Sequence, residues 1–308
     1  MSQTSVVVLG EALVDEFHDG PVAGGAPFNV ARSLAGLGAS ALFISRIGAD
    51  DTNGQLVLDS ARRYGLGEAG LQRDARHATG RVSVYEEAGN HRFEIHGDAA
   101  WDHIDGDAAQ RQLADTGSTL IYFGSLAQRH PTSRAAVRAL VKRFAGTRLL
   151  DLNLRPGDDA RLLAAESLML ADWVKLNAEE LAQLAAWFDI DGVADDAGRI
   201  AALMARFALR RVVLTCGASG WRFHGPGGEL LAQGPGVAQP LVIDTVGAGD
   251  AFTALLLAGL ALNRDLNATL ALANRYASFI CGVRGPLPAD PLALQPWRTA
   301  LHALPLSA

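Results

Sequence analysis

The sequence lacks the features that mark several large classes of protein. It has only two cysteines, Cys216 and Cys281, in 308 residues, which argues against a disulfide-stabilised scaffold. We expect a reducing compartment and two buried free thiols, although a bond between them stays open. The 27 basic residues are outnumbered by 33 acidic ones and form no basic run. Neither a nucleic acid nor a membrane is therefore an expected partner.

Long hydrophobic runs are also missing. The longest, near residues 251–262, is too short to span a bilayer. Residues 1–9 do not place a basic region before a long apolar one, so no signal peptide is expected. Hydrophobic residues make up 49% and charged residues 19% of the chain, which suits a sizeable core and argues against disorder. These features predict a soluble cytoplasmic protein.

Several familiar motifs of enzymes and nucleotide-binding proteins are absent. The eight histidines show no spacing of the H-E-x-x-H kind, which argues against a zinc site. The chain has no G-x-x-x-x-G-K-[ST] loop, no G-x-G-x-x-G after its first strand and no G-x-S-x-G turn. The chemistry of this protein must therefore come from other motifs.

Apolar runs typical of buried strands alternate with helical patterns along most of the chain. Residues 6–9 form the first such run, and a helical pattern follows over residues 28–37. The pairing recurs at 41–47 with 52–64, 120–123 with 131–144, 148–152 with 161–170, and 173–176 with 178–188, before a strand at 211–215 and helices after Asp250. This order predicts an α/β fold with a doubly wound, mainly parallel sheet and helices on both faces. Ligands of such sheets bind beyond the carboxyl ends of the strands.

One region departs from this alternation. Residues 81–87 and 91–95 are two short strands joined by Ala88-Gly89-Asn90, which predicts a hairpin. Because no helix separates them, we expect the hairpin to leave the main sheet, as an edge decoration or as a lid over a substrate. The sequence shows no repeat or interdomain linker. We therefore expect one domain over residues 1–308, with a small discontinuous β lid at about 16–23 and 81–97.

The segment D-T-V-G-A-G-D at residues 244–250 leads directly into the apolar stretch 251–262. Its two glycines allow a tight bend, and the helix that follows begins with unsatisfied N–H groups and a partial positive charge. Together these groups form a cradle for an anion. Asp250 lies at its mouth, where a carboxylate can accept a proton from an attacking hydroxyl. The plainer alternative is a tight connection in which Asp250 only caps the helix.

Further polar residues follow other predicted strands. Asp15 comes after the first strand, and Asn29 lies in G-G-A-P-F-N at the start of the first helix. A carboxylate and an amide are both suited to binding a polyol. Asn153 and Arg155 follow another strand, where the guanidinium can neutralise phosphate charge or simply close a turn.

These motifs together resemble the PfkB (ribokinase-like) family of carbohydrate kinases. Residues 244–250 match every specified position of the family pattern D-T-x-G-A-G-D, and residues 24–31 and 47–54 resemble its N-terminal pattern. The resemblance implies a ribokinase-like fold, a β lid over the sugar and ATP-dependent phosphorylation of a sugar hydroxyl. It also implies Mg²⁺, with K⁺ as an additional cation left open, and a sugar and ATP as partners.

The resemblance assigns a role to each motif. Asp250 would be the catalytic base, and Gly247, Ala248 and Gly249 would form the hole for the transferred phosphate. The implied sugar contacts are Asp15, Gly24, Gly25, Asn29, Asn153, Arg155 and Asp244. The implied nucleotide contacts are Asn177, Thr215, Gly217, Gly220, Gly249 and Asn274. Glu180, which also completes a capping box with Asn177, is implied for Mg²⁺ through water. Asp244 and Thr245, near Arg284 and Gly285, are implied for a monovalent cation.

The D-x-N-x-R segment at residues 151–155 is similar to that of fructokinases and 2-keto-3-deoxygluconate kinases rather than ribokinases. The chain therefore looks most like a fructokinase that makes fructose 6-phosphate, with 2-keto-3-deoxygluconate kinase and ribokinase as alternatives. A keto acid needs an additional basic contact, for which Arg81 or Arg92 of the hairpin are candidates. A nucleoside would favour an apolar lid. The hairpin region is instead polar, with Glu94, His96 and Asp98.

Three questions stay open. His96, Asp98 and Trp101 follow the hairpin strands and either contact the sugar or, for Trp101, pack the base of the lid. A non-catalytic sugar or nucleotide sensor is an alternative of another class, against which the retained Asp250 argues. Only eight residues separate Asp15 from Gly24, fewer than in many family members, so the lid is expected to be small. That argues against a dimer paired through the lid and leaves a homodimer open.

Overall fold

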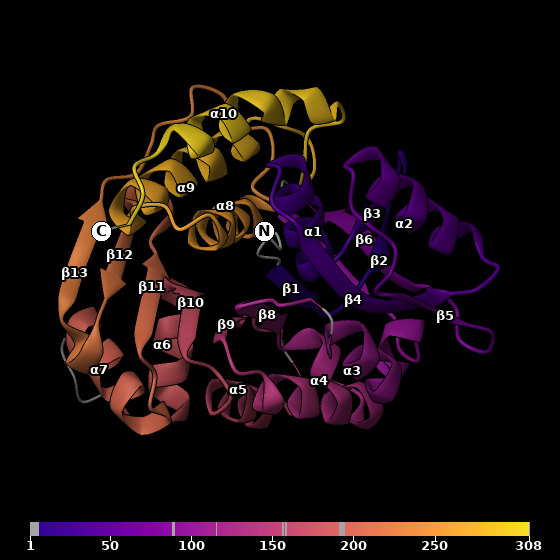
Figure 1. Ribbon diagram of the computed structural model, residues 1–308, viewed down its shortest axis with the longest axis horizontal. Coiled ribbons are helices and arrows are strands. Elements are labelled where there is room, and N and C mark those ends of the chain that lie inside the picture. The colour runs from indigo at the N-terminus through magenta and orange to yellow at the C-terminus, as the bar shows by residue number, and fades with distance from the viewer. Residues whose placement is uncertain are drawn as a thin grey trace.

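The computed structural model describes residues 6–87, 90–114, 116–155, 157, 159–190 and 195–307, apart from the side chains of residues 86–93. Its main feature is a nine-stranded sheet (Figure 1). The strands lie in the order β13 (Leu230–Gly234), β12 (Trp221–His224), β11 (Arg211–Thr215), β10 (Trp173–Asn177), β9 (Thr147–Asp151), β8 (Leu120–Gly124), β1 (Val6–Leu9), β4 (Ala41–Gly48) and β5 (Leu71–Asp74). All neighbours pair in parallel except β11 with β12 and β12 with β13, which are antiparallel.

Helices cover both faces of this sheet, as Figure 1 shows. One face carries α1 (Ala26–Gly36), α8 (Ala248–Ala261), α9 (Leu266–Cys281) and α10 (Gln295–Ala303), with α2 (Thr52–Arg63) beside them. The other carries α3 (Gly106–Ala114), α4 (Pro131–Arg143), α5 (Ala160–Leu168), α6 (Ala178–Trp187) and α7 (Asp196–Phe207). Short 3₁₀ helices are η1 (Ala100–His103), η2 (Leu126–Gln128), η3 (Gly217–Ser219), η4 (Pro226–Gly228) and η5 (Pro291–Leu294). The predicted doubly wound α/β fold is confirmed.

Each face of the sheet has its own hydrophobic core. Successive side chains of a strand point to opposite faces, so Val6 and Val8 pack with α1, α8 and α9, whereas Val7 and Leu9 pack with the helices of the other face. Residues 251–259 of α8 are buried on all sides because the helix lies between the sheet, α1 and α9. This burial accounts for the long apolar run that the sequence shows after Asp250.

A second sheet lies beside α2 and contains the predicted hairpin. Its order is β3 (Gly20–Gly24), β2 (Leu13–Phe17), β6 (Gly80–Glu87) and β7 (Asn90–Ile95). Strands β2 and β6 pair in parallel, and the other two pairs are antiparallel. The hairpin strands are confirmed, but Ala88 and Gly89 of the turn lie outside the described residues. Asp15 is therefore part of this small sheet and does not end the first strand of the main one.

The structure corrects or decides several smaller expectations. Cys216 and Cys281 are free but half-buried, where full burial was expected. The antiparallel strands β12 and β13 were not predicted, because short polar strands after residue 215 give a weak pattern. Trp101 is fully buried against Ala99 and Ala127, with the Arg129 guanidinium 3.9 Å from its ring centre, so it packs the base of the small sheet.

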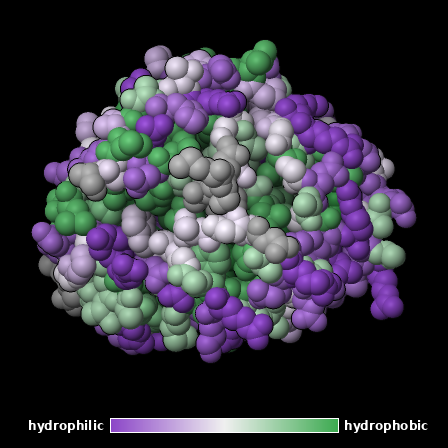
Figure 2. All heavy atoms as spheres, in the orientation of Figure 1, coloured by the Kyte–Doolittle hydropathy of each residue, from purple (hydrophilic) through white to green (hydrophobic). Residues whose placement is uncertain are grey.

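The surface in the view of Figure 2 is mixed in character. Hydrophilic residues crowd the side where α2 and β5 lie, whereas hydrophobic residues gather on the left rim, on the side of β13. Leu230 and Leu231 of β13 are exposed. In the part of the chain that the structure describes, no helix combines the length and hydrophobicity needed to cross a bilayer.

Candidate active site

A cleft of about 1270 Å³ lies where the main sheet faces the small one. Glu11 and Ser125 follow β1 and β8, Asp151 ends β9, and Asn177 ends β10, so these lining residues mark the carboxyl edge of the sheet. The small sheet contributes Leu13, Asp15, Val82, Glu94 and Ile95 to the lining. The cleft is therefore at the position that the strand order predicts for a ligand.

The N-terminus of α8 forms one end of this cleft. Gly247 precedes the helix with φ +80°, a conformation that favours glycine, and an added Cβ would lie 2.5 Å from Pro286 Cα. Asp250 is in the first turn of the helix. The first-turn N–H groups of a helix have no intrahelical acceptor and favour an anion. Gly247, Gly249 and Asp250 all line the cleft, so the predicted cradle and its carboxylate are present together.

A hydrogen bond joins this helix to the N-terminal motif. Asn29 of α1 donates from Nδ2 to Asp250 Oδ2 over 2.8 Å. The other end of the Asn29 amide accepts from the Arg32 guanidinium, with 2.5 Å between Nη2 and Oδ1. Because a guanidinium can only donate, Arg32 fixes which way the amide points. The motif residues at positions 29 and 250 are thus held in one arrangement by a third residue that the sequence analysis did not select.

Arg32 is itself held on several sides. It is 4% exposed, and it donates to the Ala23 carbonyl over 2.9 Å and to Ser60 Oγ over 2.6 Å. Its guanidinium lies 4.3 Å from the ring centre of Phe28. Burial lowers its pKa to about 10, so the group stays charged at neutral pH. The sequence did contain a signal for Arg32, since it is a basic residue within the apolar face of the first predicted helix.

Three carboxyl groups of the cleft have raised pKa values. Loss of water on burial raises the pKa of Asp250 to about 6, against the opposing effect of the Asn29 hydrogen bond. Burial likewise raises the pKa of Asp15 to about 6 and that of Glu11 to about 7. The charge of Asp250 contributes to both of the latter shifts, and Arg155 opposes all three. Carboxyl groups with pKa values near the working pH are typical of proton-transfer sites.

Lys175 supplies a fixed positive charge at the floor of the cleft. Its Nζ lies 3.0 and 3.2 Å from the two carboxylate oxygens of Asp151, its cross-strand partner. Burial would lower the Lys175 pKa, but Asp151 and Glu180 outweigh it and raise that pKa. A Cβ added to Gly249 would lie 3.0 Å from Nζ, so the ammonium lies close to the first turn of α8. The signal in the sequence was a lysine inside the apolar strand W-V-K-L-N.

Asn177 and Glu180 form the predicted capping box of α6. Asn177 Oδ1 accepts from the Glu180 N–H, and Glu180 Oε2 accepts from the Asn177 N–H, both over 2.8 Å. Glu180 Oε1 also accepts from the Leu154 N–H over 2.9 Å. The same carboxylate therefore ties the loop of Asn153 and Arg155 to α6. Within that loop Arg155 donates to Asn153 Oδ1 over 2.7 Å.

The structure brings many of the predicted site residues together. Those that line the cleft are Asp15, Gly25, Asn29, Asn153, Arg155, Asn177, Glu180, Gly247, Gly249 and Asp250. Those that do not are Gly24, Thr215, Gly217, Gly220, Asp244, Thr245, Ala248 and Asn274.

The predicted residues outside the cleft have identifiable structural surroundings. Gly24 leaves space for Asp15, since an added Cβ would lie 2.1 Å from Asp15 Oδ2. Thr215 ends β11 directly beside Asn177 of β10. Asp244 accepts from the Gly285 N–H over 3.2 Å, which places the two segments implied for a monovalent cation in contact. Asn274 donates to the Pro235 carbonyl over 2.8 Å.

Two residues near the hairpin are absent from the cleft. His96 and Asp98 line a separate cavity of about 280 Å³, together with Arg81. Arg81 instead contacts Glu16, with 3.3 Å between Nη1 and Oε2, and the Arg92 side chain lies outside the described residues.

Fold and site together define a kinase that acts on small carbohydrates. Residues 6–291 match the profile described as pfkB family carbohydrate kinase, and the chain belongs to this family. It is 31% identical to the fructokinase of Klebsiella pneumoniae in an alignment that covers 92% of this chain and 95% of the relative.

Solved structures with the same fold include two bacterial fructokinases. The enzyme of Vibrio cholerae O395, in a form with fructose, ADP and calcium ion bound, is 25% identical with a TM-score of 0.76, covering 96% of this chain and 99% of its own. The Xylella fastidiosa fructokinase with bound ATP is 24% identical with a TM-score of 0.78, covering 96% and 99%. The predicted family and the carbohydrate kinase class are therefore confirmed.

The Arg32 contact predicts a kinetic effect without any direct substrate contact. Replacing Arg32 with Met removes the donor that orients Asn29, so we expect kcat/KM for the best sugar to fall by about tenfold to a hundredfold, as small misplacements at a site do. Arg63→Met, at an exposed position of α2, is the matched control. Circular dichroism checks that both variants fold. Unchanged kinetics in folded Arg32→Met would refute the positioning role.

The raised pKa of Asp250 predicts an effect on stability. Since the folded state binds this proton more tightly than the unfolded state, the Asp250 contribution to the unfolding free energy declines as pH rises from about 4 through about 6. Asp250→Asn removes that decline. We expect the variant to be more stable than the parent at pH 8, on the order of 1 to 3 kcal/mol, and to lose the advantage near pH 4. Urea unfolding across pH measures this, and a variant that is less stable at pH 8 would contradict it.

Proposed function

We propose that this kinase transfers the γ-phosphoryl group of ATP to a primary hydroxyl of fructose, giving fructose 6-phosphate. The observation that carries the proposal is the hydrogen bond from Asn29 to Asp250. It joins the motif implied for the sugar to the cradle implied for the phosphate within one cleft. The 31% identity to a fructokinase over nearly the whole chain supports the choice of sugar.

Asp250 acts as the base in this proposal. The ionised carboxylate accepts the hydroxyl proton while the sugar oxygen bonds to the γ-phosphorus and the bond to the β–γ bridging oxygen breaks, releasing ADP. The amides of Gly247, Ala248 and Gly249 stabilise charge on the transferring group. Lys175 and Arg155 add positive charge along the cleft. Asp15, Gly25, Asn29 and Asn153 orient the sugar.

The residues at the nucleotide end fit a magnesium ion held through water. Each Glu180 oxygen already accepts one N–H bond but keeps a further lone pair, which suits a water ligand better than direct coordination. When bound with ATP, Mg²⁺ supplies charge neutralisation for the phosphates. Asn177, Thr215, Gly217, Gly220 and Asn274 are proposed for the nucleotide.

A monovalent cation such as K⁺ is proposed beside Asp244 and Thr245. The two loops that would enclose it already meet, because the Gly285 N–H donates to Asp244 Oδ2. The Val246 N–H donates to Asp244 Oδ1 over 2.9 Å, which orders the turn just before the cradle. A cation bound at this position would make the turn that leads into α8 more rigid.

The small sheet is proposed as a lid within one domain. Val82, Glu94 and Ile95 reach the cleft from β6 and β7, and Asp15 reaches it from β2. Closure of these strands would exclude water from the reacting groups. A small-molecule sugar and ATP are the proposed partners.

Several features of the cleft support fructose over the alternative substrates. A keto acid would gain from Arg81, but Arg81 contacts Glu16 and does not line the cleft. Glu94 would oppose a carboxylate there, which favours a neutral sugar over 2-keto-3-deoxygluconate. Ribokinase remains the weaker alternative because the D-x-N-x-R segment at residues 151–155 is similar to that of fructokinases rather than ribokinases. A non-catalytic sensor would have no use for a carboxylate whose pKa is raised to about 6.

Loss of the base predicts a specific kinetic pattern. Asp250→Asn should lower kcat by about a thousandfold, within the usual contribution of a general base, while sugar binding by calorimetry stays within a fewfold of the parent. In the parent, kcat/KM should fall with the fraction of ionised Asp250 as pH drops below about 6. Asp107→Asn, at an exposed position of α3, is the control. Near-normal turnover by Asp250→Asn would exclude it as the base.

A substrate panel tests the choice of sugar. We expect kcat/KM for fructose to exceed that for ribose, 2-keto-3-deoxygluconate, glucose and nucleosides, in an assay coupled to ADP release with Mg²⁺ present and with or without K⁺. The reason is the neutral, polyol-binding character of the sugar end. A higher value for any other sugar would reassign the substrate, and binding without turnover across the panel would favour the sensor.

A further inference from the structure

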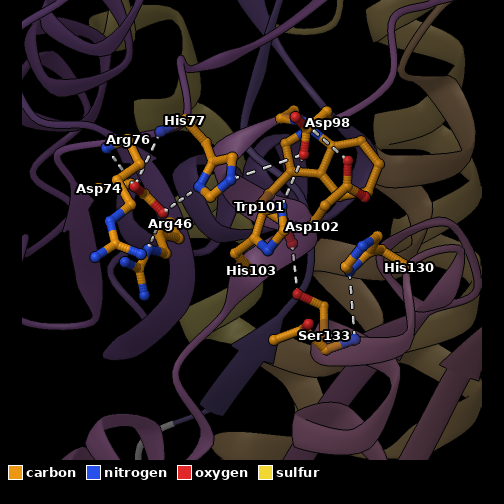
Figure 3. Close-up of polar contacts among 12 residues, drawn as sticks. Arg46, Asp74, Arg76, His77, Asp98, Trp101, Asp102, His103, His130 and Ser133 are labelled. Atoms are coloured by element: carbon orange, nitrogen blue, oxygen red, sulfur yellow. Dashed lines mark hydrogen bonds and ion pairs between the residues drawn. The ribbon is translucent and has the colours of Figure 1, made fainter.

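Three histidines and two aspartates gather at the root of the β6–β7 hairpin, outside the cleft (Figure 3). Asp74 and His77 lie where β5 leads to β6, Asp98 and His103 lie between β7 and α3, and His130 caps α4. The rings of His77 and His103 stack with centroids 3.7 Å apart and 14° between their planes. The His130 ring centre is 4.5 Å from that of His103. The fold thus brings together three histidines whose spacing in the sequence does not predict a cluster.

Asp74 determines which nitrogen of His77 carries the proton. This carboxylate is 3% exposed as a residue, lies 2.7 Å from Arg46 Nε and accepts the N–H groups of Arg76 and His77. Its Oδ2 faces His77 Nδ1 at 3.1 Å. Since a carboxylate oxygen accepts this hydrogen bond, Nδ1 is the donor, and a ring that carries its single hydrogen there has its lone pair at Nε2.

That free Nε2 faces a second carboxylate. Asp98 Oδ1 lies 3.8 Å from His77 Nε2 and 3.0 Å from His103 Nε2. Asp98 has φ +53°, a conformation in which aspartate is among the tolerated residues, and its side chain is 77% exposed. An imidazole nitrogen and a carboxylate oxygen, both of which can ligate a metal, therefore face one another from separate connections. A cation between them would satisfy both.

We propose that His77, Asp98 and His103 form a binding site for a divalent transition metal, with Zn²⁺ as the reference ion. Two imidazole nitrogens and one carboxylate oxygen are a ligand set that zinc prefers, whereas Mg²⁺ and Ca²⁺ favour oxygen ligands alone. Asp74 behind His77 completes the carboxylate–histidine–metal arrangement that orients ligands in such sites. The proposal does not depend on which sugar the kinase phosphorylates.

The distances suit a metal polyhedron once one of the stacked rings turns, because the in-plane Nε2 lone pairs of parallel rings do not meet at one point. Zinc bonds of about 2.0–2.1 Å in a tetrahedron place neighbouring ligand atoms about 3.3 Å apart. Here the three ligand atoms all lie within 4.8 Å of one another. The exposure of Asp98 and the adjoining cavity of about 280 Å³ that it lines leave room for water at the remaining position.

The position of the site gives the metal a structural role. The His77 connection leads into the β6–β7 hairpin, and the Asp98 connection leads out of it. A backbone hydrogen bond joins the two connections, from the Ala100 N–H to the Ala78 carbonyl over 2.8 Å. A metal shared by His77, Asp98 and His103 ties both ends of the hairpin to the body of the protein. We therefore expect bound metal to raise the Tm.

The test uses the full chain without nucleotide, and Zn²⁺ or Co²⁺ alone as the probe. We expect one equivalent of Zn²⁺ in calorimetry, visible absorption bands when Co²⁺ is bound, and two imidazoles in the X-ray absorption spectrum of the zinc form. His77→Gln, His103→Gln and Asp98→Asn should each weaken binding at least tenfold. Asn tolerates the Asp98 backbone conformation, so that variant separates ligand loss from misfolding.

His302→Gln, at an exposed position of α10, is the matched control and should bind as the parent does. Asp250→Asn should also bind normally, which separates this site from the cleft. The absence of saturable binding, or equal binding by folded His103→Gln, would overturn the proposal. The proposal would also be overturned if the protein took up no zinc and NMR showed a proton on His77 Nε2 at neutral pH. In that case a proton, and not a metal, would join His77 to Asp98.

Discussion

The contact between Asn29 and Asp250 is the constraint on which the rest of the site depends. It connects the first helix with a helix more than two hundred residues later, and it does so across the carboxyl edge of the sheet. Arg32 fixes the direction of this hydrogen bond because it donates to the oxygen of the Asn29 amide. The two helices also pack against one another within the same core, so the hydrogen bond is supported by apolar burial. A polar link held this way lets two distant motifs behave as one rigid unit.

The cleft gathers like charge, and this determines its chemistry. Burial raises the proton affinity of Glu11, Asp15 and Asp250, and the charge of Asp250 adds to the shifts of the other two. Lys175 and Arg155 offset only part of this, since Lys175 is already paired with Asp151. The folded protein therefore keeps an unfavourable concentration of carboxylates at the position proposed for the base. Stability given up at such a position is common in catalytic sites.

The sequence was sufficient for the parts of the fold and site that depend on local patterns. Buried β-branched strands, helical periodicity and the cradle at residues 244–250 are local, and each was predicted from neighbouring residues. Arg32 and Lys175 escaped selection because a single charged residue in an apolar segment reveals nothing about its partner. Asp15 was placed after the first strand because the parallel pairing of β2 with β6 joins segments more than sixty residues apart. The histidine cluster was missed for the same reason, as its members share no spacing.

The small sheet is inserted into the fold at two places, between β1 and α1 and between β5 and η1. Neither insertion interrupts the strand order of the main sheet. The chain can therefore lengthen, shorten or reshape the far ends of these four strands without interrupting the main sheet. Within such an architecture the strands of the small sheet and the helix that follows residues 244–250 are carried by different stretches of sequence, so that one can diverge during evolution while the other is retained.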